Sequence, residues 1–281
     1  MQCSLITGAS GFIGTALARQ LRARGGRVIA LVRPSSHIEA LVHLGVETRV
    51  GNMLDSDSMA AAMVGIDTVY HLASMLKMPW KDAFVSANIT GCANVVTAAA
   101  GQPTPPRLVL VSSMAAAGPS PHGSTRKESD KPQPVSLYGR VKLAGERVAI
   151  PYANEVPISI VRPPMVFGST DRTSLPLFRA ASRGLSLSPP GGTYVALIHV
   201  EDLANMLIAV AHRGERLVSP GSDGQGIYQL AHQHQPSSAE LGRLIATACG
   251  RGRVRDIQLP AGVLLTAAQL SQWWGMLRDR P

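Results

Sequence analysis

The sequence predicts an α/β protein built on a doubly wound parallel sheet. Up to Val161, short apolar runs alternate with longer amphipathic segments, which is the pattern of a sheet wrapped by helices. Apolar residues make up 45% and charged residues 16% of the 281 residues, which is enough for a sizeable core. A glycine-rich turn joins the first candidate strand to the first candidate helix, as in folds that bind phosphates there.

The candidate strands are rich in β-branched residues and nearly free of polar ones, as expected for a sheet covered on both faces. They are Cys3–Thr7, Arg27–Val32, Thr48–Val50, Thr68–Leu72, Arg107–Ser112 and Ile158–Val161. The candidate helices between them are Phe12–Arg24, Asp57–Met63, Ala83–Ala100 and Ser136–Ala149. The segment Gly118–Val135 is rich in Pro, Ser and charge, and it predicts a long exposed loop.

Composition narrows the class of protein. The net charge of +9 suits an anionic ligand, but the arginines are not interleaved with aromatic residues, so we expect no nucleic-acid partner. The three cysteines predict reduced thiols, and His232 and His234 lack a third ligand, so no metal site is expected. No transmembrane segment or signal peptide is expected, which favours a cytoplasmic protein.

The turn that follows the first strand reads Thr7-Gly8-Ala9-Ser10-Gly11-Phe12-Ile13-Gly14. Glycines allow a tight turn here and let the backbone approach a diphosphate, which then rests on amides at the helix N-terminus. We therefore expect a Rossmann-type dinucleotide site whose contacts are Gly8, Ser10, Gly11, Phe12, Ile13 and Gly14.

This glycine spacing resembles that of the extended short-chain dehydrogenase/reductase family, also called the NAD-dependent epimerase/dehydratase family. The resemblance recurs in order at His71–Ser74, Asn88–Gly91, Arg162–Gly168 and Ile198–Ala204, and it covers residues 3 to about 231. It implies an Asn-x-x-Gly helix start at Asn88, which joins the catalytic set. It also implies cofactor contacts from Leu72, Ala73, Ser74, Pro163 and Val166.

The choice of nicotinamide cofactor depends on the end of the second strand. Enzymes that select NAD usually place an acid there, whereas this chain has Arg33, whose guanidinium could pair with a 2′-phosphate. NADP is therefore preferred and NAD stays open, since Arg33 could also be a solvated loop residue. The family commonly has Gly-Asp where this chain has Gly51-Asn52, so Asn52 is expected to contact the adenine, with Met53 beside it.

The catalytic prediction rests on Tyr138 and Lys142, which are four residues apart and so share one face of a helix. The resemblance makes Tyr138 the acid/base, and Lys142 would lower its pKa and hold the nicotinamide ribose. Ser113, after the fifth strand, would bond the substrate oxygen. Ser112 is the competing choice, but we expect it to be packed or bonded to backbone.

Departures from the family pattern point to the substrate. Dehydratases of the family carry Asp-Glu after the catalytic hydroxyl, but this chain has Met114-Ala115, so dehydration is not expected. Met165 replaces the Asn of nucleotide-sugar epimerases. With Met75, Met114 and Met165 near the expected site, an apolar ketone or alcohol is favoured, and His199 could also reach the pocket. Core packing remains the other interpretation of these methionines.

Three hypotheses remain open. The first is an NADP-dependent ketoreductase or alcohol dehydrogenase acting on a small molecule; the second is a sugar epimerase; the third is a non-catalytic dinucleotide sensor.

Residues 1–164 are expected mainly to form the dinucleotide-binding domain, and residues 165–281 mainly a smaller substrate lobe, interleaved in one compact body. Its candidate helices are Leu175–Arg183, Val200–His212, Ser238–Cys249 and Ala261–Leu277, of which the last is expected to be a packing helix or lid. The resemblance also implies a homodimer.

Overall fold

A computed structural model describes residues 2–74, 81–121, 124–189, 193–218 and 224–258. Its main element is a seven-stranded sheet, in which every neighbouring pair is parallel and the order is β10-β6-β5-β4-β1-β2-β3. The strands are β1 (Cys3–Thr7), β2 (Arg27–Val32), β3 (Glu47–Val50), β4 (Thr68–His71), β5 (Arg107–Val111), β6 (Ile158–Arg162) and β10 (Ile227–Gln229). The predicted Rossmann-type parallel sheet is confirmed.

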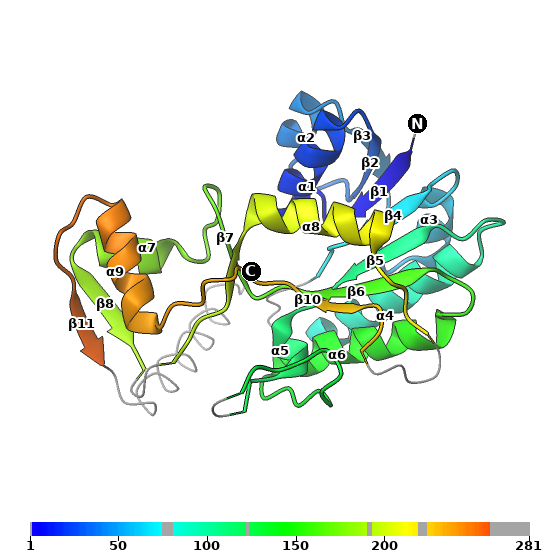
Figure 1. The fold of residues 1–281 in the computed structure, drawn as a ribbon. Coiled ribbons are helices and arrows are strands. Elements are labelled where there is room, and N and C mark those ends of the chain that lie inside the picture. The colour runs from blue at the N-terminus through cyan, green and yellow to red at the C-terminus, as the bar shows by residue number, and fades with distance from the viewer. Residues whose placement is uncertain (1, 75–80, 122–123, 190–192, 219–223, 259–281) are drawn as a thin grey trace. The chain divides into compact units, whose positions relative to one another are not determined.

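Helices cover both faces of this sheet (Figure 1). On one face α1 (Phe12–Ala23) packs against α8 (Val200–Arg213). On the other face α4 (Lys81–Ala100) packs between α3 (Ser56–Ala62) and α6 (Leu137–Ala149). The inward residues of α3 and α4 and those of the five central strands form the main apolar core, as the near-continuous apolar strands require.

The short elements were not predicted. They are α2 (Glu39–His43), α5 (Met114–Ala117) and the 3₁₀ turn η1 (Ile150–Tyr152). The expected helix start at Asn88 was wrong, because α4 already begins at Lys81 and Asn88 lies inside it. The fifth strand ends at Val111, so Ser112 and Ser113 belong to the turn into α5.

The chain divides into two units. The first holds residues 1–164 and 199–230, so α8 and β10 return to the sheet after an excursion of the chain. The second holds residues 165–198 and 231–281. Its described elements are β7 (Met165–Phe167), α7 (Leu175–Ser182), β8 (Leu185–Ser188), β9 (Leu197–His199), α9 (Ser238–Ala248) and β11 (Arg255–Gln258). A small core of Ala181, Ile245 and Ala246 joins α7 to α9. The candidate helix Ala261–Leu277 lies outside the described residues.

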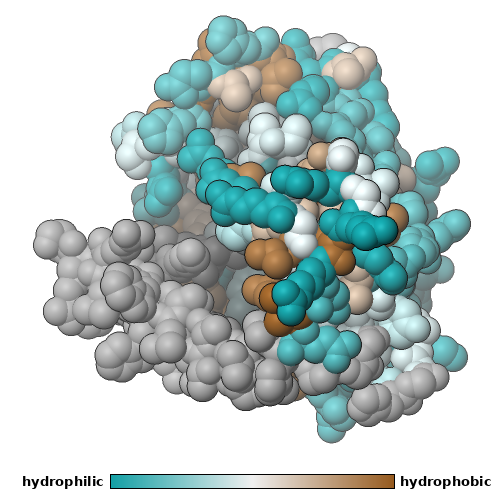
Figure 2. Space-filling model, turned by 90° about the vertical axis from the view of Figure 1, so that its left-hand side faces the viewer, coloured by the Kyte–Doolittle hydropathy of each residue, from teal (hydrophilic) through white to brown (hydrophobic). Residues whose placement is uncertain are grey.

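Most of the described surface seen in Figure 2 is hydrophilic, with small hydrophobic groups between the polar residues. None of the helices in the described part of the chain combines the length and the apolar character needed to span a bilayer.

Candidate active site

Two loops meet in the middle of the sheet, one after β1 and one after β4. These strands are neighbours in the sheet, although α1, α2, α3 and the strands β2 and β3 lie between them in sequence. This is the point where strand order reverses, and in open α/β sheets ligands bind outside the strand ends at that point. The loops are joined directly: Thr7 Oγ1 is 2.7 Å from His71 Nδ1, and it accepts a hydrogen bond from Ala73 N at 3.3 Å. Gly8 has φ of 75°, and a Cβ there would lie 2.8 Å from Ala73 N. Only glycine fits both demands.

The start of α1 is open to an anion. Gly11 is its N-cap, no side chain caps it, and its first turn contains no acidic residue. The first amides of a helix, here those of Phe12 and Ile13, have no partner within the helix. Ser10 and Gly11 are exposed beside them. The glycines, the exposed loop and the uncapped amides together fit the diphosphate of a dinucleotide.

Gly14 lies where the helix presses on the loop. A Cβ at this position would overlap the Gly8 carbonyl oxygen and lie 2.6 Å from the Ala9 Cα. We expect Gly14→Ala to lower the free energy of unfolding by about 1–3 kcal/mol, because rigid backbone would have to move. Urea unfolding measures this. Gly252→Ala is the control, since Gly252 has open space around its added Cβ. Equal stability of the two variants would contradict the close packing.

Three expected cofactor contacts follow β2 and β3. Arg33 is exposed, and within the described residues its guanidinium has no partner, while its backbone bonds Ser36. Asn52 Oδ1 accepts from Leu54 N at 3.0 Å, and the side chain is exposed. Met53 is half-buried against the core beside Gly91, where a Cβ would lie 3.0 Å from the Met53 sulfur. Gly91, the glycine of the Asn-x-x-Gly motif, thus leaves the space that the Met53 side chain occupies.

The three predicted catalytic side chains meet at the carboxyl end of β5. Ser113 caps α5, where its Oγ accepts from Ala115 N at 3.2 Å. Tyr138 lies in the first turn of α6, where its hydroxyl is near enough to Ser113 for that hydroxyl to favour the phenolate. Lys142, one turn further, donates from Nζ to the Val111 carbonyl at 2.8 Å. The helix spacing and the strand end together place all three groups as the sequence indicated.

The electrostatics differ from the simple expectation of an acidified tyrosine. Burial raises the pKa of Tyr138 above its usual value, and the nearby Ser113 hydroxyl only partly offsets this. Burial lowers the pKa of Lys142 to about 8, against the favourable charges of Cys92 and Glu146. Without cofactor the phenol therefore holds its proton at neutral pH, as a general acid must before it donates.

Asn88 projects from α4 toward the end of β4. Its Oδ1 accepts from Ser74 Oγ and its Nδ2 donates to the Phe84 carbonyl, both at 2.8 Å. Burial lowers the pKa of nearby His71 to about 3, helped by Lys142, so the imidazole stays neutral. Asn88, His71 and Lys142 line one small cavity of about 20 Å³. That is room for one water molecule among several polar groups.

Sequence reasoning missed a buried charged cluster behind this cavity. Arg162 and Glu146 are each 2% exposed at the side chain and form a two-bonded ion pair, with contacts of 3.0 and 2.6 Å. The Ser112 hydroxyl donates to the same Glu146 carboxylate. Ser112 is buried, as expected, but its hydroxyl bonds the Glu146 side chain and not the backbone. The signal in the sequence was spacing: Glu146 comes four residues after Lys142, on the same face of the helix.

The expected substrate residues are scattered among the parts of the chain. Met114 is half-buried directly after Ser113, and its amide donates to the carbonyl of buried Pro163 at 2.9 Å. Met165 and Val166 belong to the second unit, and Met75 lies outside the described residues. His199 caps α8, where its Nδ1 accepts from Glu201 N at 3.4 Å. The structure brings together Ser113, Tyr138, Lys142 and Met114.

Comparison with known proteins identifies the family. The model of the "NAD dependent epimerase/dehydratase family" matches residues 4–229, most of the chain. The chain belongs to this family. The ceramide reductase of Caulobacter vibrioides is 31% identical, with 98% of this chain and 79% of that protein covered. The 2-alkyl-3-oxoalkanoate reductase of Stenotrophomonas maltophilia is 28% identical, with 98% and 84% covered.

A solved structure of MoeE5 in complex with UDP-glucose and NAD is 25% identical, with a TM-score of 0.71 over 91% of this chain and 85% of that one. By its family and its relatives named as reductases and dehydrogenases, the chain is an enzyme of the NAD(P)-dependent oxidoreductase type. The family resemblance read from the glycine turn and the later motifs is confirmed.

Proposed function

We propose that this member of the epimerase/dehydratase family is an NADP-dependent reductase of a ketone, or dehydrogenase of the corresponding secondary alcohol, on a mostly apolar small molecule. The observation that carries the proposal is that Ser113 acts on the Tyr138 phenol beside the end of β5, while Lys142, one helical turn further along α6, is bonded to the last residue of that strand. Two hydroxyl donors beside a cation suit a carbonyl oxygen that gains negative charge.

In the reductive direction, the residues of this chain act on the substrate oxygen. Ser113 holds the carbonyl oxygen, and Tyr138 donates its proton to that oxygen as the carbonyl carbon is reduced. The Lys142 ammonium, one turn further along the same helix, would stabilise the phenolate that remains. The bound cofactor supplies the hydride at its nicotinamide C4. Oxidation of the alcohol uses the same groups in reverse.

The preference for NADP rests on Arg33, whose guanidinium is unpaired within the described residues and close to the end of β2. An arginine there can pair with a 2′-phosphate, and no acid stands in its place to bind a ribose hydroxyl. We expect Arg33→Ala to weaken NADPH binding about 10- to 100-fold and to leave NADH binding nearly unchanged. Fluorescence titration of both cofactors measures the two affinities.

Two further variants separate the outcomes of this titration. Arg243→Ala removes an exposed arginine of α9 in the second unit and should leave both affinities unchanged. Gly11→Ala places a Cβ 3.3 Å from the Gly8 oxygen, a tight contact that asks only a few tenths of an ångström of the loop, and it fills space beside the first amides of α1. This variant should weaken the binding of both NADPH and NADH. Equal binding of NADPH and NADH by the native chain would refute the NADP assignment. Binding of neither cofactor would refute the proposed oxidoreductase activity.

An apolar substrate is supported by two observations. Met114 follows Ser113 where the dehydratases of the family carry acids, so no proton-transfer group stands there to remove water. Relatives of this chain carry names such as ceramide reductase and 3-beta-hydroxysteroid dehydrogenase, whose substrates are largely apolar. A sugar epimerase would use the same Ser–Tyr–Lys set, but would return the hydride to its product. Net consumption of NADPH with a ketone substrate separates the two.

A further inference from the structure

A cluster of three arginines and a histidine lies where α1 and α8 end, at the amino-terminal edge of the parallel sheet. Arg24 follows α1, His212 and Arg213 close α8, and Arg107 opens β5; all four are exposed. Burial lowers the pKa of His212, and the charges of Arg107, Arg24, Arg213 and Arg216 lower it further. Four guanidinium groups therefore act on one imidazole.

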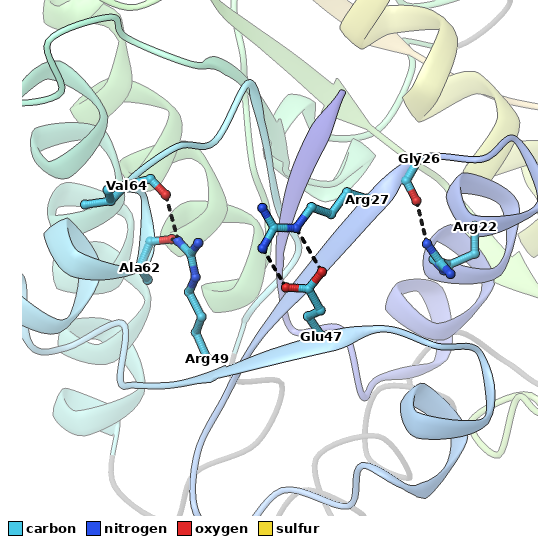
Figure 3. A network of polar contacts seen from close by, with 7 residues as sticks. All are labelled: Arg22, Gly26, Arg27, Glu47, Arg49, Ala62 and Val64. Carbon is cyan, nitrogen blue, oxygen red and sulfur yellow. Dashed lines mark hydrogen bonds and ion pairs between the residues drawn. The ribbon is translucent and has the colours of Figure 1, made fainter. Parts of the chain in front are cut away.

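Other arginines near this end of the sheet are engaged by the protein itself (Figure 3). Arg27 pairs with Glu47 through two contacts of 2.8 Å. Arg49 donates to two backbone carbonyls at 2.6 and 3.0 Å, and Arg22 also donates to two, at 3.2 and 2.9 Å. The guanidinium groups of these three arginines are bonded to carboxylate or carbonyl oxygens of the protein, so these arginines have a structural role.

Among the residues that the structure describes, the arginines around His212 bond only to neutral groups. Arg24 donates to the Asn205 side-chain oxygen at 2.8 Å. Arg216 donates to two carbonyls in the last turn of α8, at 3.0 and 2.7 Å. Within the described residues, Arg107 and Arg213 have no side-chain partner at all.

Nearby negative groups do not balance this charge. The Asp67 carboxylate, which precedes β4, bonds Cys3 N at 2.7 Å. Glu215 is exposed, and no ion pair within the described chain joins it to an arginine. The two helix ends contribute a charge of about −0.5 each, and Arg216 already bonds the carbonyls of α8. Four arginines thus exceed what the fold itself neutralises.

The cluster borders a surface hollow of about 500 Å³, which we name the α1/α8 groove. Its lining combines Arg24, His212 and Arg213 with Asn205 and apolar side chains of α8, among them Met206, Ile208 and Ala209. That volume is in the range of small-molecule sites. Behind the groove, Tyr70 is fully buried and its hydroxyl has no partner among the described residues, although Arg24 and Arg107 act on it.

We propose that the α1/α8 groove is a second anion site, which binds a phosphate group through Arg24, Arg213 and His212. The site lies at the amino ends of the strands, whereas the glycine turn lies at their carboxyl ends. Arginine forks match phosphate geometry, and a dianion would attract a proton to His212. The phosphate belongs to a free phosphoester or to a lipid headgroup, whose chains Met206 and Ala209 would border.

The test follows the imidazole signal of His212 by NMR, assigned with a His212→Gln variant, during titration with inorganic phosphate. We expect saturable binding that raises the pKa of His212, and an Arg213→Gln variant that weakens the affinity about tenfold. The signal of His212 is used because the glycine turn can also take phosphate. Flotation with phosphatidylcholine vesicles that contain phosphatidate tests the headgroup source.

Arg243→Gln is the matched control, because it removes the same charge from α9. Binding that Arg213→Gln weakens and Arg243→Gln does not supports the site. Vesicle binding with the same dependence, but no response to free phosphate, supports the site with a headgroup as ligand. Equal weakening by both variants would mean general attraction to a basic protein and would overturn the proposal, as would no response of His212 to either probe.

Discussion

The Tyr138→Phe variant is expected to lose turnover by about 100- to 10,000-fold while it binds cofactor as well as the native chain. Loss of a general acid has this size, and the aromatic ring of residue 138 is retained. Steady-state rates with a ketone substrate and NADPH, together with cofactor titration of the same preparation, measure both quantities.

Tyr152→Phe is the control for this variant. The Tyr152 hydroxyl is 3.1 Å from Thr97 Oγ1 at the far end of α6, away from the Ser113 hydroxyl, so its removal should leave turnover intact. Native-like turnover of Tyr138→Phe would remove Tyr138 from the chemistry. Loss of cofactor binding in that variant would instead show that its defect is not confined to proton transfer.

The second large effect is expected at Glu146. Glu146→Gln would leave the buried Arg162 guanidinium with a neutral partner, and breaking such a pair costs about 3–5 kcal/mol of the free energy of unfolding. The variant also removes a negative charge that raises the pKa of Lys142. The Lys142 ammonium should then lose its proton at lower pH, so activity should decline at a lower pH than in the native enzyme. Urea unfolding and a pH–rate profile measure the two effects.

The double variant Glu146→Leu with Arg162→Met separates charge from packing. Replacing both partners by apolar groups should recover much of the lost stability, because no unpaired charge remains. It should not restore the pH profile, since Lys142 still lacks its neighbouring carboxylate. A single Glu146→Gln variant as stable as the native chain would contradict the assignment of a buried, charged pair.

The strands with unbroken apolar runs were predictable, and β1 and β2 have the bounds that the sequence indicated. A strand covered on both faces is defined by its own composition, so no knowledge of its partners is needed. The short strands of the second unit were missed because each has only three or four residues, such as Met165–Phe167 and Leu185–Ser188. Local pattern does not define segments of that length.

The placement of the candidate catalytic side chains was also predictable, because Tyr138 and Lys142 share a helix face and Ser113 follows a buried strand. The cluster of Arg162 and Glu146 was not. A charged residue at a strand end usually indicates the start of a solvated loop, and its partner is sixteen residues distant on another element. Only the packing of α6 against the sheet brings the two together.

The interrupted first unit has a consequence for how the chain is made. The face of the sheet that carries α1 is covered by α8, whose residues come after the whole segment 165–198 of the second unit. During synthesis, the surface of α1 that packs against α8 therefore stays exposed until residues near 213 have left the ribosome. A fragment that stops at Pro164 would contain the glycine turn and the candidate catalytic residues yet expose that face to solvent. Truncated chains that end before α8 should therefore aggregate more and depend more on chaperones than chains that include α8.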